Sequence, residues 1–266
     1  MHRALFRLII LVLSTQTVMA ANTQEVTVND PVLGARAITY EQQGGYALVE
    51  GDIILGRAHE LGVKHAAILP KVTGGRWPHG IVPFEFSADL PADNLHAVLY
   101  AMYILQKQTN IKFIVLNDQN KQQYPDYLVF LPATGTTCAS EVGKKGGRQE
   151  IILAPRCNAM NNVHEIMHAL GFWHEQSRQD RDSYVRIVWE NIAEDHIYNF
   201  NQHLSECKDY GNYDYQSIMH YPANAFSKNG KATIVPLQDK VEIGQRNQLS
   251  PHDILAINAM YPEGED

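Results

Sequence analysis

The chain has 266 residues, of which 45% are hydrophobic and 19% are charged. These proportions are typical of a folded globular protein and exclude a disordered or collagen-like chain. The formal net charge of −7, from 22 Lys and Arg against 29 Asp and Glu, gives no bulk attraction to nucleic acid or to an anionic membrane, so we expect neither as a partner.

The first twenty residues have the layout of a secretory signal peptide. Arg3 and Arg7 precede an apolar run over residues 8–13, and small residues lead up to Ala20. The run is too short to cross about 30 Å of hydrocarbon as a permanent helix, so we expect no membrane anchor. We therefore predict cleavage after Ala20 and export to the extracellular space. A buried N-terminal strand is the alternative.

The next predicted elements alternate between strands and one helix. Residues 22–65 lack a sustained period and contain four glycines, which predicts an extended segment lying on the rest of the protein. Apolar residues at helical spacing behind Pro91 predict a helix over 93–108, with Asp93 as its cap. The predicted strands cover residues 81–86, 111–116, 127–131 and 150–153.

Two more helices are predicted further along. An apolar stripe marks one over residues 163–170. Three asparagines precede this helix, and each can cap its first turn: Asn158, Asn161 and Asn162. Regular patterns are then scarce until Ser250, a capping residue that is followed by Pro251 at the first helical position. This arrangement predicts a helix near the end of the sequence.

Three cysteines leave one thiol unpaired in any redox compartment. Export permits a disulfide, and Cys138 and Cys157 are the pair closest in sequence. Closing a loop of that length stabilises a fold by roughly 3 kcal/mol in the loop-entropy model. Two free buried thiols are the alternative.

His164, Glu165 and His168 form the pattern H-E-x-x-H. Histidines four apart on a helix lie about 40° apart around its axis, so both imidazoles can reach one ion. A left-handed Gly171 would end the helix and turn the chain back, which lets His174 supply a third nitrogen. Three protein ligands leave an open position, so the pattern predicts one catalytic Zn²⁺ per chain. A set of exposed helix histidines is the alternative.

The predicted chemistry is hydrolysis of peptide bonds. A zinc-activated water has a pKa near ~7, and Glu165 can take its proton as the general base and pass it to the leaving amine. The ion also polarises the scissile carbonyl. We therefore expect protein or peptide substrates and a metalloendopeptidase activity.

Residues 164–182 read HEIMHALGFWHEQSRQDRD, and residues 217–221 read SIMHY. With these motifs the sequence resembles the astacin family of metzincin zinc metallopeptidases over about 77–261. The resemblance implies an α+β fold of two lobes. The upper lobe would hold a mixed twisted sheet and two long helices, and the lower lobe would be mostly irregular with a C-terminal helix. It also implies a catalytic-domain-only form with a signal peptide (1–20), a propeptide (21–65) and a peptidase domain (66–266).

The resemblance assigns roles to residues around the predicted zinc. Met219 would be the apolar floor of the Met turn beneath the ion. Tyr221 would be a fifth ligand that leaves the metal and donates to the oxyanion; ordinary core packing is the alternative for both residues. Glu175 would contact the new α-amino group of the matured enzyme, whose start resembles the sequence at Ala66. The resemblance also implies the disulfide between Cys138 and Cys157.

Latency and specificity follow from two further matches. Asp52, in the sequence EGDI at 50–53, resembles the propeptide aspartate that binds the zinc and displaces the catalytic water; an ordinary turn carboxylate is the alternative. Arg246 matches a position in the pocket for the residue after the scissile bond, where it would favour acidic side chains, and a structural salt bridge is the alternative. Substrate is expected to bind extended along an edge near residues 140–143.

One family feature is missing. Both partners of the family's second disulfide are absent, so Cys207 is expected to be a free thiol, with pairing between molecules as the alternative. We expect a monomer. Two other classes of protein remain as alternatives. One is a zincin with a distant Glu as third ligand, and the other is a zinc-containing adhesion protein, which the presence of Glu165 and Tyr221 does not favour.

Overall fold

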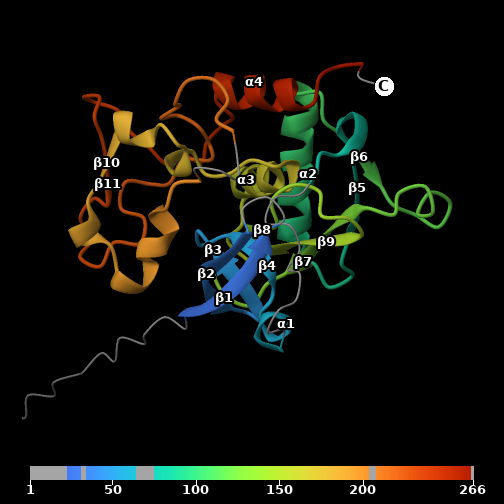
Figure 1. Ribbon diagram of the computed structural model, residues 1–266. Helices are drawn as coiled ribbons and strands as arrows, with labels where there is room; N and C mark the ends of the chain where they lie inside the picture. The colour runs from blue at the N-terminus through green and yellow to red at the C-terminus, as the bar shows by residue number, and fades with distance from the viewer. Residues whose placement is uncertain (1–22, 31–33, 64–74, 204–207, 265–266) are drawn as a thin grey trace, which may run out of the picture.

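The computed structural model describes residues 23–30, 34–63, 75–203 and 208–264 (Figure 1). The predicted signal peptide, the predicted cut before Ala66 and Cys207 lie outside these residues. The strands are β1 (Thr23–Asp30), β2 (Gly34–Gln43), β3 (Tyr46–Val49), β4 (Ile53–Arg57), β5 (Ile81–Phe86), β6 (Lys112–Val115), β7 (Tyr127–Pro132), β8 (Ala139–Ser140), β9 (Arg148–Leu153), β10 (Val185–Ile187) and β11 (Ile234–Pro236). The helices are α1 (Ala58–Val63), α2 (Ala92–Gln108), α3 (Ala159–Leu170) and α4 (Pro251–Met260).

One mixed sheet organises the protein, with strand order β1-β2-β3-β4-β8-β9-β7-β5-β6. Strands β5, β6 and β7 are parallel to their partners, and β9 is parallel to β7, whereas β8 is antiparallel to β9. The sheet is continuous across β4 and β8, which pair in parallel at Ile53 and Ser140. The predicted α+β class with a mixed sheet is confirmed.

The main core lies between the sheet and the helices. Val82 and Phe84 of β5 contribute to it, and α2 adds residues at helical spacing, among them Val98 and Leu105. The predicted helix over 93–108 and the four predicted strands agree with the structure to within one or two residues. Helix α4 packs on the same core through Ile257.

The predicted cap of α2 is wrong. The residue at the cap position is Pro91, which makes no side-chain capping bond and whose carbonyl accepts a hydrogen bond from the N–H of Leu95 (3.0 Å). Asp93 lies inside the first turn. There its negative charge interacts favourably with the positive end of the helix dipole, so an acidic residue in the first turn still stabilises the helix.

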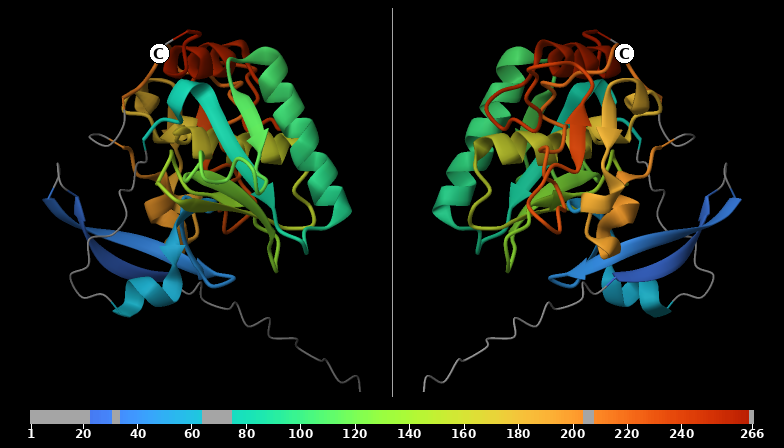
Figure 2. Two further views of the ribbon diagram at one scale, coloured as in Figure 1. Left: turned by 90° about the vertical axis from the view of Figure 1, so that its right-hand side faces the viewer. Right: turned by 90° about the vertical axis from the view of Figure 1, so that its left-hand side faces the viewer.

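Residues 23–30 and 34–63, together called the N-terminal segment below, have more structure than the predicted extended stretch. They form the antiparallel pairs β1–β2, β2–β3 and β3–β4, followed by α1. Gly44 and Gly45, with φ of 57° and 86°, make the two-residue turn between β2 and β3. The β1–β2 hairpin projects from the body of the protein (Figure 2).

The N-terminal segment is packed onto the rest of the chain through a second core. Its buried members are Tyr40, Ala47, Val49, Ile53, Ala58, Leu61 and Val142, and Trp173 packs against them. Because Val142 and Trp173 lie beyond the segment, removing the segment would expose both side chains. The surface on which the N-terminal segment lies therefore includes Val142 and Trp173.

Residues 172–203 and 208–250 form a region with little regular structure. Short 3₁₀ turns and the β10–β11 pair surround a third core that includes Ile192, Phe200 and Tyr221. A disulfide joins Cys138, just before β8, to Cys157, just before α3, with their Cα atoms 6.0 Å apart. Among the described residues, no helix is long and apolar enough to cross a membrane.

Candidate active site

Helix α3 positions the H-E-x-x-H residues. Asn158 is its cap, since its Oδ1 accepts hydrogen bonds from the N–H groups of Met160 (2.9 Å) and Asn161 (3.0 Å). Asn161 returns the contact by accepting from the N–H of Asn158 (3.2 Å). Such a capping box satisfies orphan donors at both residues and fixes where the helix begins.

Gly171 ends α3 and turns the chain toward the site. Its φ of 113° is in the left-handed region, and its N–H donates to the carbonyl of His168 (2.8 Å). The next N–H, of Phe172, donates to the carbonyl of Met167 (3.0 Å). This reversal brings His174 back beside the helix.

The structure brings His164, His168 and His174 together with Asp52. One ligand atom from each lies within 4.8 Å of the others. Asp52 Oδ2 is 3.3 Å from Nε2 of His164, and Asp52 Oδ1 is 3.2 Å from Nε2 of His174 and 3.7 Å from Nε2 of His168. All three histidines are buried, so their ring nitrogens meet inside the protein.

The protonation of two rings can be read from their partners. Nδ1 of His164 lies 2.8 Å from the carbonyl of Ile218, and Nδ1 of His168 lies 2.8 Å from the carbonyl of Phe172. A carbonyl only accepts, so each Nδ1 carries the proton and each Nε2 presents a lone pair. His174 Nδ1 faces a carboxylate, which imposes the same tautomer on the neutral ring.

This donor set fits a zinc ion. Lone pairs on three imidazoles and a carboxylate converge on one point, which is unfavourable unless a cation lies between them. His168 Nε2 and Asp52 Oδ1 are buried without a hydrogen-bond partner among the described residues. Three histidine nitrogens with one carboxylate oxygen is a four-ligand set that zinc accepts.

The electrostatics of His174 point the same way. Burial disfavours its charged form, but the carboxylates of Asp52 and Glu50 outweigh burial and raise the pKa of His174 to about 9. The field at this ring therefore favours positive charge, whether a proton or a metal ion. Asp52 itself is held ionised, because the three histidines outweigh its burial and lower its pKa well below the usual value.

Glu165 lies within the same buried region. Its side chain is only 3% exposed, and Oε2 has no hydrogen-bond partner among the described residues. Burial, reinforced by the charge of Asp52, raises the pKa of Glu165 well above its usual value. A carboxyl group tuned in this way holds a proton more readily than an exposed glutamate does.

The turn at Met219 lies beside the histidines and is fixed from α4. Asp253 Oδ2 accepts from the N–H of Ile218 (2.9 Å), and Oδ1 accepts from the hydroxyl of Ser217 (2.6 Å). The phenol of Tyr221 donates to the carbonyl of Glu50 (2.5 Å), and its ring centroid lies 4.6 Å from that of His174. The sequence indicated Asp253 only as part of a helix start, so its support of this turn was missed.

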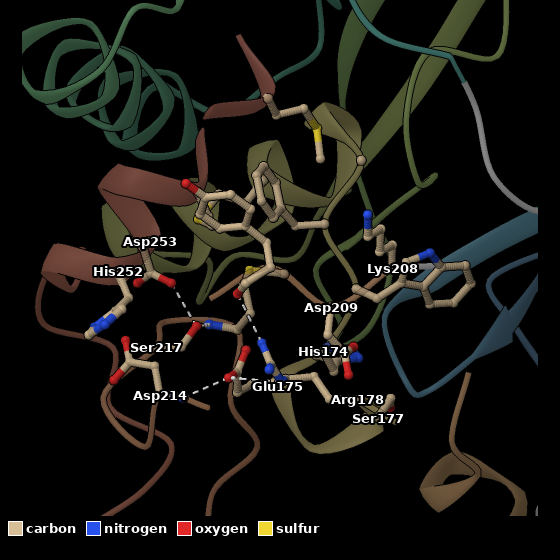
Figure 3. Close-up of a pocket in the computed structure, with 18 of the residues that line it drawn as sticks. His174, Glu175, Ser177, Arg178, Lys208, Asp209, Asp214, Ser217, His252 and Asp253 are labelled. Carbon is tan, nitrogen blue, oxygen red and sulfur yellow. Dashed lines mark hydrogen bonds and ion pairs between the residues drawn. The ribbon is translucent and has the colours of Figure 1, made fainter. Parts of the chain in front are cut away.

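Glu175 borders a cavity of about 120 Å³, in which Figure 3 shows it beside Asp214 and Arg178. Its Oε1 accepts from the N–H of Asp214 (2.7 Å) and lies 3.7 Å from Nε of Arg178. Burial, opposed by Arg178, raises the pKa of Glu175 to about 8. The cavity therefore offers a carboxyl group that a buried ammonium would stabilise in its charged form.

Arg246 makes hydrogen bonds to the backbone. Its Nη1 donates to the carbonyls of His220 and Gln245, both at 3.0 Å. Within the described part of the chain no carboxylate lies within 4.0 Å of its guanidinium, so the alternative of a structural salt bridge is not what the structure has. The backbone bonds fix the side chain next to the Met219 turn.

Glu50 is the site residue that the sequence did not single out. It is 5% exposed, and its carboxylate contacts Nδ1 of His174 (2.6 Å), the hydroxyl of Ser177 (3.1 Å) and Nε2 of His203. The available signal was its place directly before Gly51-Asp52. These partners are 124 residues or more away in sequence, which local patterns cannot reveal.

The fold and the histidine centre together have the features of a zinc metallopeptidase. The comparisons with known proteins give the family. The family model for Astacin, which describes a family of peptidases, matches residues 71–262. Zinc metalloproteinase nas-4 of Caenorhabditis elegans is 41% identical over 195 residues, which are 70% of this chain and 59% of that protein. The chain belongs to the astacin family.

A solved structure agrees with this assignment. High choriolytic enzyme 1, a hatching enzyme zinc-protease from Oryzias latipes, matches with a TM-score of 0.63 and 37% identity over 72% of this chain and 95% of that chain. Astacin-like metalloendopeptidase of Mus musculus is 35% identical over 87% of this chain and 52% of its own length. The matches to nas-4 and to the mouse protein thus cover between half and two thirds of the length of each relative.

Proposed function

We propose that this chain is the latent precursor of an exported zinc endopeptidase, which becomes active when the residues before about Ala66 are removed. The observation that carries the proposal is the centre where three histidine Nε2 atoms face the carboxylate of Asp52, with Glu165 buried next to His164. Membership of the astacin family supports zinc as the ion and peptide bonds as the substrate.

Zinc, when bound, supplies a Lewis acid that polarises the scissile carbonyl and lowers the pKa of water to about 7. The three histidines would hold the ion through Nε2, with backbone carbonyls orienting two of the rings. Glu165 accepts a proton from the attacking water as the C–O bond forms, and then gives that proton to the departing nitrogen as the C–N bond breaks. Its raised pKa suits a group that must both take and give a proton.

Tyr221 is proposed to stabilise the developing oxyanion. In the precursor its phenol is held by the carbonyl of Glu50 (2.5 Å). Removal of the N-terminal segment frees this O–H to donate to the substrate carbonyl as negative charge grows there. Met219 would form the floor of the site in the tight turn that Asp253 fixes.

Latency is proposed to come from Asp52. Its carboxylate occupies the side of the histidine centre that a catalytic water would need. Maturation would remove Asp52 and create a new α-amino group at Ala66. The cavity at Glu175 suits that ammonium, because a charge partner there would lower the raised pKa of the carboxyl group.

Substrate is proposed to bind extended along β8. In the precursor this edge is paired with β4 at Ser140, so the N-terminal segment blocks it. Release of the segment would leave the backbone groups of β8 free to pair with a peptide. Arg246, held by backbone bonds without a carboxylate partner among the described residues, would favour an acidic residue after the scissile bond.

The test uses protein that has been cut before Ala66 and separated from its N-terminal segment. We expect it to cleave casein, to lose this activity to a chelator and to regain it with zinc. Glu165→Gln should keep one zinc by metal analysis but cleave about 10²–10⁴-fold more slowly. His174→Ala should lose the metal, because it removes one of three nitrogen ligands. Full activity in Glu165→Gln would contradict the proposed mechanism, and retention of zinc in His174→Ala would favour a zincin with a different third ligand.

A further inference from the structure

The three histidines differ in what holds their outer nitrogens. Nδ1 of His164 donates to the carbonyl of Ile218, and Nδ1 of His168 donates to the carbonyl of Phe172, both at 2.8 Å. Nδ1 of His174 instead contacts Oε2 of Glu50, at 2.6 Å. Two rings are therefore oriented by the part of the chain that becomes the mature enzyme, and the third is oriented by the N-terminal segment.

Glu50 is held firmly in this position. Its N–H donates to Oδ1 of Asn199 (2.8 Å), and its carbonyl accepts from Tyr221 (2.5 Å). Its φ of 49° is in the left-handed region, which is uncommon for a non-glycine residue. A Cβ at the following residue, Gly51, would lie 2.7 Å from Cζ of Phe226, so any side chain there would require that ring to shift.

The second oxygen of the carboxylate also has a partner. Oε1 contacts Nε2 of His203, while Oε2 is shared between His174 and the hydroxyl of Ser177. A buried carboxylate that is satisfied at both oxygens keeps a fixed orientation. Its negative charge then lies directly behind the ring that presents Nε2 to the metal centre.

We propose that Glu50 is the outer carboxylate of a carboxylate–histidine–zinc triad with His174, and that the precursor therefore holds zinc more tightly than the same centre without Glu50 does. The inference rests on the proposed function as a latent zinc precursor. A carboxylate behind a ligating imidazole fixes its tautomer and increases its basicity, and losing such a partner typically weakens metal binding 10–100-fold.

On this view the N-terminal segment acts on the metal from two sides. Asp52 contacts the inner nitrogens, and Glu50 contacts the outer nitrogen of one ring. Removal of the segment takes away both carboxylates at once. Processing would then change the affinity of the site for its metal as well as opening it to substrate.

The experiment measures the zinc dissociation constant of the uncut precursor by competition with a fluorescent chelator. All proteins carry Glu165→Gln to prevent self-cleavage. We expect Glu50→Ala to bind zinc 10–100-fold more weakly and Glu50→Gln to lie between Glu50→Ala and the parent, since an amide oxygen can still accept from Nδ1. Glu60→Gln is the matched control, because Glu60 is exposed on α1 and contacts none of these groups; it should bind zinc like the parent.

A second comparison separates an outer carboxylate from a residue that only positions Asp52. The Glu50→Gln change is repeated in precursor carrying Asp52→Asn. If Glu50 acts through His174, the loss of affinity persists in this background; a loss that disappears would overturn the inference. Thermal unfolding checks that each variant is folded, and the isosteric Glu50→Gln provides the test should Glu50→Ala not fold.

The outcomes also separate this inference from the proposed function. A Glu60→Gln precursor that binds no zinc would overturn both. Control protein that binds one zinc, together with Glu50 variants that bind it equally tightly, would overturn the triad alone and leave Glu50 as a fastening of the segment. Zinc binding that is weaker only in the Glu50 variants, both with Asp52 and with Asp52→Asn, would support the triad.

Discussion

Asp52 is a single carboxylate that faces three ring nitrogens, with its nearest contact to His174 at 3.2 Å. The three histidines outweigh the burial of this carboxylate and stabilise its ionised form, as its lowered pKa indicates. The residue is therefore well placed to stay bound to the centre at neutral pH. Alanine at this position removes the contact while leaving the backbone pairing of β4 in place.

Asp52→Ala should make the uncut precursor measurably active on a fluorogenic peptide, because the site on the histidines becomes open to water. The Glu60→Gln precursor is the comparison and should stay silent. Substrate access along β8 remains blocked, so activity should be below that of the cut enzyme. An Asp52→Ala precursor as inactive as the unmodified one would count against the switch.

At the scale of single residues, the sequence was sufficient to predict those site residues that lie close to one another along the chain. His164, His168 and His174 lie within eleven positions, and the helix period alone indicates that the first two converge. Glu50 could not be predicted, because its burial depends on Asn199, Tyr221 and other partners far along the chain. A charged side chain next to a glycine is read locally as a surface turn.

Among the elements, the turn after α3 determines where the third ligand lies. Gly171 has a φ of 113°, which an L-residue with a Cβ adopts only with strain. Space is not the limit, since a Cβ there would meet its nearest neighbour, Sδ of Met260, at an ordinary 3.5 Å. Backbone strain is thus the main cost of a substitution.

Gly171→Ala should lower the free energy of unfolding by about 1–2 kcal/mol, the cost of a left-handed conformation. Urea unfolding of the Glu165→Gln precursor measures it. Gly75→Ala is the matched control: Gly75 lacks a positive φ, and a Cβ there would have 3.8 Å to its nearest atom. Equal midpoints for the two variants would show that the turn carries no such strain.

The regular elements were predicted well because they bury one face periodically, as α2 and β5 do. The region over 172–203 and 208–250 was predicted only to be irregular, because its conformation depends on side-chain to backbone bonds between distant residues. Arg181, for example, is buried and donates to the carbonyls of Gln176 (3.1 Å) and Phe200. Such a network leaves no hydrophobic period in the sequence.

At the scale of the whole molecule, the N-terminal segment is joined to the rest by contacts of several kinds. Its strand β4 extends the sheet through β8. Nη2 of Arg57 contacts both carboxylate oxygens of Glu150, at 2.7 and 2.8 Å, and the phenol of Tyr46 donates to the same carboxylate (2.7 Å). None of these contacts depends on the peptide link near Ala66.

We therefore expect the segment to stay bound after a single cut before Ala66. The two pieces should elute together in gel filtration, and activity should lag behind cleavage as followed by mass spectrometry. Arg57→Ala should shorten the lag, because it removes one partner of a largely buried carboxylate. Immediate separation of the pieces with no lag would contradict this.

The order of the chain has a consequence for the timing of synthesis. Asp52 precedes His164 by 112 residues, and His174 and Tyr221 follow later still. At about 5–20 residues per second, the aspartate leaves the ribosome roughly 6–22 s before the first histidine. The nascent chain therefore never contains all three histidines without the carboxylate that faces them, so the proposed latency would apply from the moment the histidine centre is made.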